Sequence, residues 1–299
     1  MKLWQDYVVP VSVSEALQAL ASAPGLAVPL AGGTDLLLDL DQGRHAPAHT
    51  LVDLTAVAEM IALERRGEDI FIGAAVPLSR IAGDPLVLAH AEALAEACNL
   101  IGGPQVRNVA TLGGNVAHAL PAADGTIALL ALDAVAEIAS LSGSRRMHLV
   151  ELFAGAGKST LKVGLELIVG FHLRVWREPL GSCFNRIMRP QGVALPIINV
   201  AACLERRGDF VNAARIAIGP GGQTPWRARE AEDALIGTKF SVETLDRALA
   251  ALLSKVAFRT SARRASAEYR RHLAVELFRE TLTSAWDRAL DERGRHEAS

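Results

Sequence analysis

At the start of the chain, apolar runs separated by proline and glycine predict short alternating elements. Residues 8–22 are typical of an extended piece followed by an amphipathic helix, and the apolar run 26–30 is typical of a strand. Two glycines and a leucine-rich stretch at 36–40 then predict a tight turn and a second helix, and 51–54 a second strand. We therefore expect a small βαβ-like unit at this end of the molecule.

The pattern changes further along the chain. A strand pair, helices and more strands precede a Pro-Gly-containing linker at 177–181, and beyond it a block of strands precedes a block of helices, which indicates an α+β fold. The expected strands are 61–65, 70–74, 134–141, 148–152, 163–175, 195–204, 210–212 and 214–218, and the expected helices are 86–99, 126–132 and several within 228–291. The predicted parts are 1–177, with subdomains at about 1–57 and 58–177, then 182–291 and a tail at 292–299.

Composition narrows the class of protein. Half of the 299 residues are hydrophobic and 21% are charged, which suits globular domains and excludes disordered and collagen-like chains. A formal charge of −2 gives no basic signature for nucleic acid. Arginines do gather near the C-terminus, but they alternate with glutamates, so we expect a solvated helix face there. These arginines are Arg259, Arg263, Arg264, Arg270, Arg271 and Arg279.

The three cysteines, Cys98, Cys183 and Cys203, are too widely spaced for an iron–sulfur cluster or a zinc knuckle within this chain. Buried free thiols in a reducing compartment are the expectation. The first residues lack a hydrophobic signal region, and no run of about 18 apolar residues occurs. We therefore expect a cytoplasmic protein without a membrane span.

Several catalytic motifs fail on their spacing. Residues 157–159, Gly-Lys-Ser, suggest a P-loop, but Leu152 stands where that motif needs its first glycine. The eight histidines show no zinc-ligand spacing, and neither a Gly-x-Ser-x-Gly elbow nor a Gly-x-Gly-x-x-Gly turn occurs. These patterns disfavour P-loop nucleotide hydrolysis, zinc chemistry, serine hydrolysis and Rossmann-type dinucleotide binding.

What remains is a pair of similar glycine loops, Ala31-Gly32-Gly33-Thr34-Asp35 and Thr111-Leu112-Gly113-Gly114-Asn115. Paired glycines let a backbone approach a ligand closely, and a following helix N-terminus offers N–H groups to a diphosphate. Thr34, Thr111 and Asn115 would add side-chain donors. The alternative is an ordinary strand–turn–helix junction, in which Thr34 or Asp35 serves only as a helix N-cap.

Asp124 follows the second loop by nine residues, just past Pro121. Its position predicts a hydrogen bond to a ribose hydroxyl, an N-cap for the helix at 126–132, or both, because the two roles are compatible. The two glycine loops and this carboxylate are the site candidates that survive the search for motifs.

Eight segments spread over nearly the whole chain match one known family. They are 31–37, 105–108, 111–115, 121–124, 155–161, 215–219, 224–228 and 265–273. Together they resemble the FAD-binding medium subunit of the molybdenum hydroxylases, the group of xanthine dehydrogenase, carbon monoxide dehydrogenase and aldehyde oxidoreductase. Two glycine loops in the correct order, followed by these later blocks, make the resemblance specific.

The resemblance implies a two-part PCMH-type FAD-binding domain, followed by a C-terminal flavoprotein domain with a small antiparallel sheet and helices. The two loops would hold the FAD diphosphate, and Asp124 the ribitol or ribose side. Ile101 and Leu161 would lie against the isoalloxazine ring, and His118 near the FAD chain. The implied FAD-binding residues are Ala31, Gly32, Gly33, Thr34, Asp35, Ile101, Thr111, Gly113, Gly114, Asn115, His118, Asp124 and Leu161, with no catalytic or metal-binding residue in this chain.

The resemblance also implies a function as an FAD-dependent oxidoreductase subunit. Electrons would come from the [2Fe–2S] clusters of a small partner subunit, after oxidation of substrate at a molybdopterin cofactor in a large one. FAD would pass them to NAD, a quinone or another acceptor, in a dimer of heterotrimers. Residues 186–194 depart from the family's basic-and-aspartate run, which leaves contacts there and the acceptor open. A self-sufficient single-chain flavin oxidoreductase and a cofactor-free scaffold stay open as alternatives.

Overall fold

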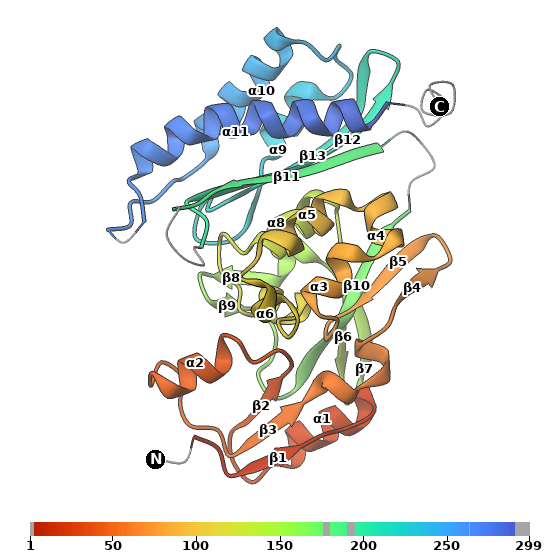
Figure 1. Ribbon diagram of the computed structural model, residues 1–299, viewed down its shortest axis with the longest axis vertical. Coiled ribbons are helices and arrows are strands. Elements are labelled where there is room, and N and C mark those ends of the chain that lie inside the picture. The colour runs from red at the N-terminus through yellow and green to blue at the C-terminus, as the bar shows by residue number, and fades with distance from the viewer. Residues whose placement is uncertain (1–2, 176–179, 190–194, 263, 291–299) are drawn as a thin grey trace.

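The structure is a computed structural model that describes residues 3–175, 180–189, 195–262 and 264–290. A three-stranded parallel sheet lies at one end, a five-stranded antiparallel sheet in the middle, and a four-stranded antiparallel sheet covered by helices at the other end (Figure 1). The predicted α+β fold, with a two-part N-terminal region and a C-terminal sheet with helices, is confirmed. The predictions for 177–179, 190–194, Arg263 and the tail lie outside the described residues.

The N-terminal unit is built on parallel strand pairing, as the sequence predicts. β3 lies between β1 and β2, and Leu51 of β3 is paired with Tyr7 on one side and Val28 on the other. Ser12 caps α1 by accepting a hydrogen bond from the N–H of Glu15 at 3.2 Å. The elements are β1 (Asp6–Val8), α1 (Val13–Ser22), β2 (Ala27–Leu30), α2 (Leu36–Asp41) and β3 (Thr50–Asp53).

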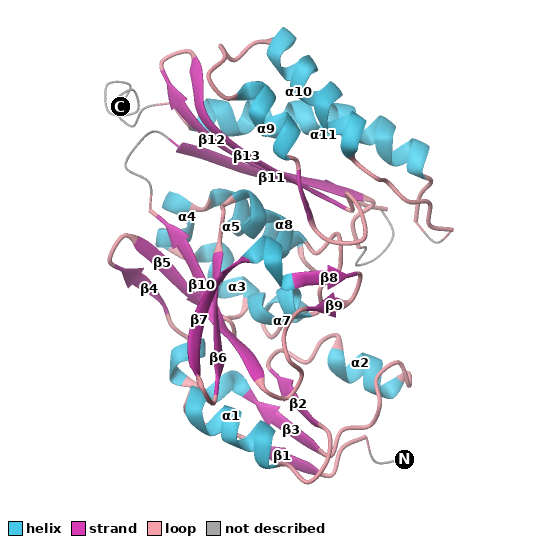
Figure 2. Cartoon of the chain, turned by 180° about the vertical axis from the view of Figure 1, so that it is seen from behind, coloured by secondary structure: helices cyan, strands magenta, loops and turns pink. Residues whose placement is uncertain are grey.

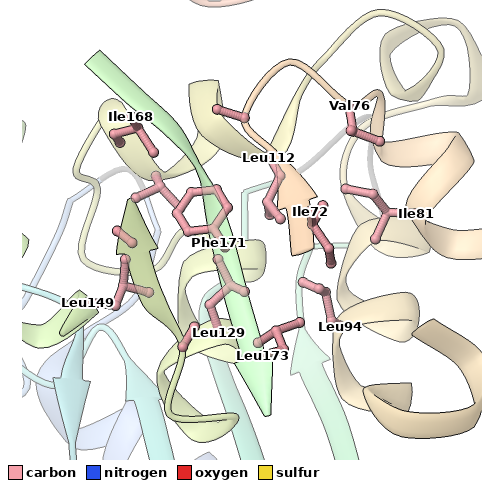
Figure 3. Packing of buried hydrophobic residues seen from close by; sticks show 14 of the residues in the cluster. Ile72, Val76, Ile81, Leu94, Leu112, Leu129, Leu149, Ile168, Phe171 and Leu173 are labelled. Carbon is pink, nitrogen blue, oxygen red and sulfur yellow. The ribbon is translucent and has the colours of Figure 1, made fainter. Parts of the chain in front are cut away.

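The middle unit has the strand order β4-β5-β10-β6-β7. Figure 3 shows Phe171 of the central strand β10 among the buried side chains of Leu94, Leu112 and Leu129, which come from three helices. The elements are η1 (Leu54–Ala56), η2 (Ala58–Met60), β4 (Leu63–Arg66), β5 (Asp69–Gly73), α3 (Leu78–Gly83), α4 (Pro85–His90), α5 (Glu92–Leu100), α6 (Pro104–Arg107), α7 (Leu112–Ala117), α8 (Asp124–Ala131), β6 (Val135–Ser140), β7 (Gly143–His148), η3 (Leu149–Leu152), β8 (Phe153–Gly155), β9 (Lys158–Ser159) and β10 (Glu166–Arg174).

Two predicted elements of this unit are wrong in detail. The single helix at 86–99 is two helices, α4 and α5, because Ala91 has φ −146° and ψ 45° and interrupts the helix. The strand expected at 148–152 is the 3-10 turn η3, and the strand β7 comes before it. β7 forms the edge of the sheet and is largely exposed, so its polar residues gave no apolar pattern.

The C-terminal unit contains a sheet that is buried on both faces. The strand order is β11-β12-β13-β14, and β12 is buried from Ile198 to Glu205. The strands predicted at 210–212 and 214–218 are one strand, β13, and amphipathic helices fill much of 228–291 as predicted. The elements are β11 (Leu180–Ile187), β12 (Ile198–Arg207), β13 (Phe210–Gly219), β14 (Trp226–Arg227), α9 (Arg229–Leu235), α10 (Val242–Lys255) and α11 (Ala267–Arg288).

This sheet joins the two halves of the chain. One face packs through Phe184, Ala201 and Ala217 against the core of the middle unit, and the opposite face packs against the C-terminal helices (Figure 2). Glu96 of α5 accepts hydrogen bonds from the N–H of Phe184 at 2.8 Å and from Nη2 of Arg288 at 2.6 Å. The middle unit and the C-terminal unit therefore share an interface of apolar packing and partly buried polar contacts. None of the described helices is both long and apolar enough to cross a membrane.

Candidate cofactor-binding site

The first glycine loop connects β2 to α2 and lies against the backbone just before the second loop. A Cβ atom on Gly32 would lie 2.3 Å from the carbonyl oxygen of Val109 and 2.6 Å from Cα of Ala110. Gly33 has φ 68°, in the left-handed region that favours glycine. Ala31 packs at the edge of the large buried cluster of the middle unit. The glycines therefore let the two loops come together across the two units.

The first loop carries backbone donors that the fold does not use. In the described part of the chain, the N–H groups of Gly32, Gly33, Thr34 and Asp35 have no hydrogen-bond partner. Asp35 occupies the N-cap position of α2 but makes no side-chain cap hydrogen bond, so the expectation that Thr34 or Asp35 caps this helix is wrong. Consecutive unpaired N–H groups form a concave site for an anion such as a diphosphate.

The first N–H groups of the second loop are used within the fold, unlike those of the first loop. Thr111 caps α7 by accepting a hydrogen bond from the N–H of Gly114 at 3.2 Å, and the N–H of Gly113 donates to the carbonyl of Ala74 at 2.8 Å. The N–H of Leu112 donates to the carbonyl of Val76 at 3.4 Å. The prediction that both loops offer free N–H groups is therefore wrong for this one. The reason is close packing, because α7 lies so near residue 74 that its first donors bond there.

Gly114 is the part of the second loop that faces outward. It is exposed, and a Cβ atom there would meet only Oγ1 of Thr111, at 3.2 Å. Asn115 next to it accepts a hydrogen bond from the N–H of Thr126 at 3.1 Å through Oδ1. Asn115 thus caps α8 and fixes it relative to α7, while Gly114 leaves its part of the second loop exposed and without a side chain.

Asp124 is the first residue of α8 and is buried, with 4% of its surface exposed. Its carboxylate accepts hydrogen bonds from Nη1 of Arg186 at 2.5 Å and Nδ2 of Asn199 at 2.6 Å. The N-cap position belongs to Ala123, so the capping role expected for Asp124 is wrong. Burial raises the pKa of the Asp124 carboxyl, and Arg186 and Asn199 oppose that rise.

Arg186 and Asn199 are site residues that sequence reasoning did not assign. Both lie on the C-terminal sheet, and Arg186 also donates through Nη2 to the carbonyl of Leu100, next to Ile101. The available signal was the segment 186–194, whose first residue is this arginine. Its contact with Asp124 spans 62 positions of the chain and depends on how the two halves pack.

The residues expected near the flavin ring come from three separate elements. Ile101 follows α5 and Leu161 follows β9, and both are partly buried against the middle core. His118 ends α7, and the N–H of Gly157 in the β8–β9 turn donates to the carbonyl of Ala119 at 3.0 Å. The hairpin that leads to Leu161 is therefore tied to the chain beside His118. The Gly-Lys-Ser segment is a β-hairpin rather than a P-loop.

These features fit FAD. The unpaired N–H groups of 32–35 suit its diphosphate, the bare surface of Gly114 lets a ligand approach, and Ile101 and Leu161 supply apolar contacts for a ring. Nε of Arg186 is buried and lacks a hydrogen-bond partner among the described residues. A hydrogen-bond donor without an acceptor therefore lies beside Asp124.

Comparison with known proteins gives the same answer. Residues 3–175 match the FAD binding domain in molybdopterin dehydrogenase, and residues 182–285 match the CO dehydrogenase flavoprotein C-terminal domain. A xanthine dehydrogenase FAD-binding subunit of Escherichia coli is 32% identical over 278 residues, which cover 92% of this chain and 93% of that protein. A nicotine 6-hydroxylase medium subunit of Paenarthrobacter nicotinovorans is 31% identical over 281 residues, which cover 93% and 96%.

Solved structures agree with this result. A chain of carbon monoxide dehydrogenase from Hydrogenophaga pseudoflava superposes with a TM-score of 0.89 at 28% identity, covering 95% of this chain and 98% of that one. A chain of quinoline 2-oxidoreductase from Pseudomonas putida gives 0.87 at 28% identity, covering 96% and 98%. Fold and site thus define an FAD-dependent oxidoreductase subunit. The chain belongs to the family of FAD-binding medium subunits of molybdopterin-dependent dehydrogenases, and the resemblance seen in the sequence is confirmed.

The buried pair of Asp124 and Arg186 leads to a stability prediction. Replacing Asp124 with alanine leaves the Arg186 charge buried without its carboxylate, so we expect the free energy of unfolding to fall by about 3 kcal/mol. Urea denaturation of the variant measures this loss. The double variant Asp124→Ala/Arg186→Met should recover most of it, because both charges are then gone. A loss below about 0.5 kcal/mol in the single variant would show that the pair is not formed.

Proposed function

We propose that this chain is the electron-transferring flavin subunit of a complex with a small [2Fe–2S] subunit and a large molybdopterin-binding subunit. Membership of the FAD-binding medium subunits supports this assignment. So do the relatives, one of which is named a medium subunit and another of which is a carbon monoxide dehydrogenase described as lacking the Mo-pyranopterin moiety of its molybdenum cofactor. The observation that carries it is the row of unpaired N–H groups at 32–35, set against the second glycine loop.

Each part of the site has a task in this proposal. The N–H groups of the first loop hold the diphosphate, and Gly114 leaves room for it. Asp124, fixed by Arg186 and Asn199, lies on the ribitol or ribose side. Ile101 and Leu161 exclude water from the ring, and His118 lies near the chain between ring and diphosphate. When bound, FAD supplies the redox chemistry that links the clusters of the partner subunit to an external acceptor.

The wider organisation is also a proposal. We place the domain division at 1–177 and 182–291, supported by the separate buried cluster beneath α9, α10 and α11. The complex is a dimer of heterotrimers whose electron acceptor is NAD, a quinone or another acceptor. We place it in the cytoplasm, and the three buried free thiols suit such a reducing compartment.

Purification of the tagged full-length chain from its own cells tests this function. We expect FAD to be retained in a ratio of about one per chain, and iron and molybdenum to purify with it in two further chains. The variant Gly114→Val should bring down the same iron and molybdenum without FAD, which separates assembly from flavin binding. If the chain purifies alone and oxidises an organic substrate at a normal enzymatic rate, it is a self-sufficient oxidoreductase and the proposal is wrong.

A further inference from the structure

Among the described arginines near the C-terminus, Arg259 and Arg271 are exposed, as their spacing predicts, but one arginine is not. Arg279 is also partly exposed, and it pairs with Asp246 at 2.8 Å. Arg270, in contrast, has 1% of its surface exposed and is the largest fully buried side chain among the described residues. A buried guanidinium calls for an anion or a full set of hydrogen bonds.

Arg270 has neither in the described part of the chain. Its Nη1 donates to the carbonyl of Ile197, but its buried Nε has no partner there, and no carboxylate pairs with it. Burial, together with the neighbouring charges of Arg264 and Arg259, lowers its pKa. Burial and Arg259 likewise lower the pKa of Arg264. Three like charges are therefore held together without a carboxylate partner among the described residues.

The backbone around these arginines is held in place by hydrogen bonds within residues 260–267. Ser261 pairs with Ala265 in a β-bridge, and the N–H of Ala267 donates to Oγ1 of Thr260 at 3.1 Å. Arg270 is the fourth residue of α11, a 22-residue helix. The N-terminus of a helix favours anions and disfavours cations. The helix and the three guanidinium groups therefore attract the same kind of ligand.

A cavity of about 560 Å³ is lined by Arg259, one of these three arginines, and lies between the β8–β9 hairpin and the loop that follows α10. Lys158, Gln223 and Arg259 line it with polar groups, and Gly155, Ala156 and Gly222 leave space between them. The loop carrying Gly222 is tied to the arginine segment, because the N–H of Ala257 donates to the carbonyl of Gly221 at 3.0 Å. The volume lies in the range of small-molecule sites.

We propose that this cavity binds a phosphate group, with Lys158 and Arg259 as direct donors and with Arg264 and Arg270 adding positive potential behind them. Phosphate suits the site because guanidinium groups bind its oxygens in pairs and the local charge has no other counter-ion among the described residues. The group belongs either to free phosphate or to a phosphate-bearing electron acceptor. The second source rests on the proposed function, since the hairpin that lines the cavity leads to Leu161, expected beside the flavin ring.

Titration of the FAD-loaded full-length chain with inorganic pyrophosphate tests the site, since bound FAD occupies the glycine loops. We expect saturable binding by calorimetry and a rise in the thermal midpoint beyond that of sodium chloride at equal ionic strength. Lys158→Gln and Arg259→Gln should each weaken the affinity about tenfold or more, because each removes a charge-assisted hydrogen bond. Lys255→Gln, the same charge change at the exposed end of α10, should leave it unchanged.

The outcomes separate the two sources and the two proposals. If NADH binds more tightly than pyrophosphate and loses affinity in Arg259→Gln, the phosphate belongs to the acceptor; equal affinities identify a free phosphate site. If pyrophosphate stabilises no better than chloride, or if Arg259→Gln keeps its affinity, the site does not exist. Should the chain bind no FAD, the same titration of Arg259→Gln against unaltered chain still tests the cavity, so its failure is distinct from that of the flavin assignment.

Discussion

The variant Gly114→Val is expected to fold normally and to lose FAD. A Cβ atom there would lie close only to Oγ1 of Thr111, at 3.2 Å, and a small shift of that side chain relieves the contact, so we expect the chain to tolerate the substitution. The branched side chain of valine projects instead from the exposed surface of the second loop, where we expect the FAD diphosphate to pass. Blocking two charge-assisted hydrogen bonds to the diphosphate removes about 3 kcal/mol, which corresponds to an affinity about 100-fold weaker. Fluorescence titration of FAD into the FAD-free chain measures the dissociation constant.

Gly83→Val is the matched control. Gly83 ends α3, and a Cβ atom there would have no atom within 4 Å. It adds the same side chain to an exposed glycine away from the loops, so its FAD affinity should equal that of the unaltered chain. Full FAD binding by Gly114→Val would mean that the ligand does not pass over the second loop.

One residue earlier, the same substitution should destabilise the fold itself. A Cβ atom on Gly113 would lie 2.5 Å from both the carbonyl oxygen and Cβ of Ala74. Valine therefore pushes α7 off the end of β5 and breaks the hydrogen bond from Gly113 to Ala74. We expect the free energy of unfolding to fall by about 3 kcal/mol, the usual range for overpacking at a closed contact.

Chemical denaturation of the FAD-free chains compares the two variants directly. Gly113→Val should unfold at clearly lower urea concentration than Gly114→Val, although both change one glycine in the same loop. Equal stability of the two variants would contradict the close packing of α7 on residue 74. A loss of FAD by both variants is expected, but only Gly114→Val loses it with the fold intact.

The elements that could be predicted are those whose burial shows as periodicity. α1 has its buried residues at helical spacing, and β2 and β3 are short apolar runs between turns, so local pattern and tertiary environment agree. The edge strand β7 has few buried residues to reveal it. β11 begins in the segment predicted as a linker, and what buries it is the packing of α5 and α11, which lie far away in the sequence.

In the candidate site, too, the features set by local sequence could be predicted and those set by tertiary packing could not. The two glycine loops could be found because a glycine pair is itself a local requirement of the backbone. The difference between them, free N–H groups in the first loop and paired ones in the second, could not be predicted. It depends on Ala74, whose carbonyl accepts the hydrogen bond from the N–H of Gly113. The partners of Asp124 and the burial of Arg270 likewise follow from how the C-terminal sheet and helices pack. Spacing along a helix indicates a face but not what covers it.

Hydrogen exchange of backbone amides, with and without FAD, tests the central claim most directly. We expect the amides of residues 32–35 to exchange fast in the FAD-free chain, because they have no partner among the described residues, and to slow down when FAD binds. The amide of Gly113 should be protected in both states, because it is already bonded to Ala74. Tight FAD binding that leaves the exchange at 32–35 unchanged would contradict the assignment of the diphosphate to the first loop.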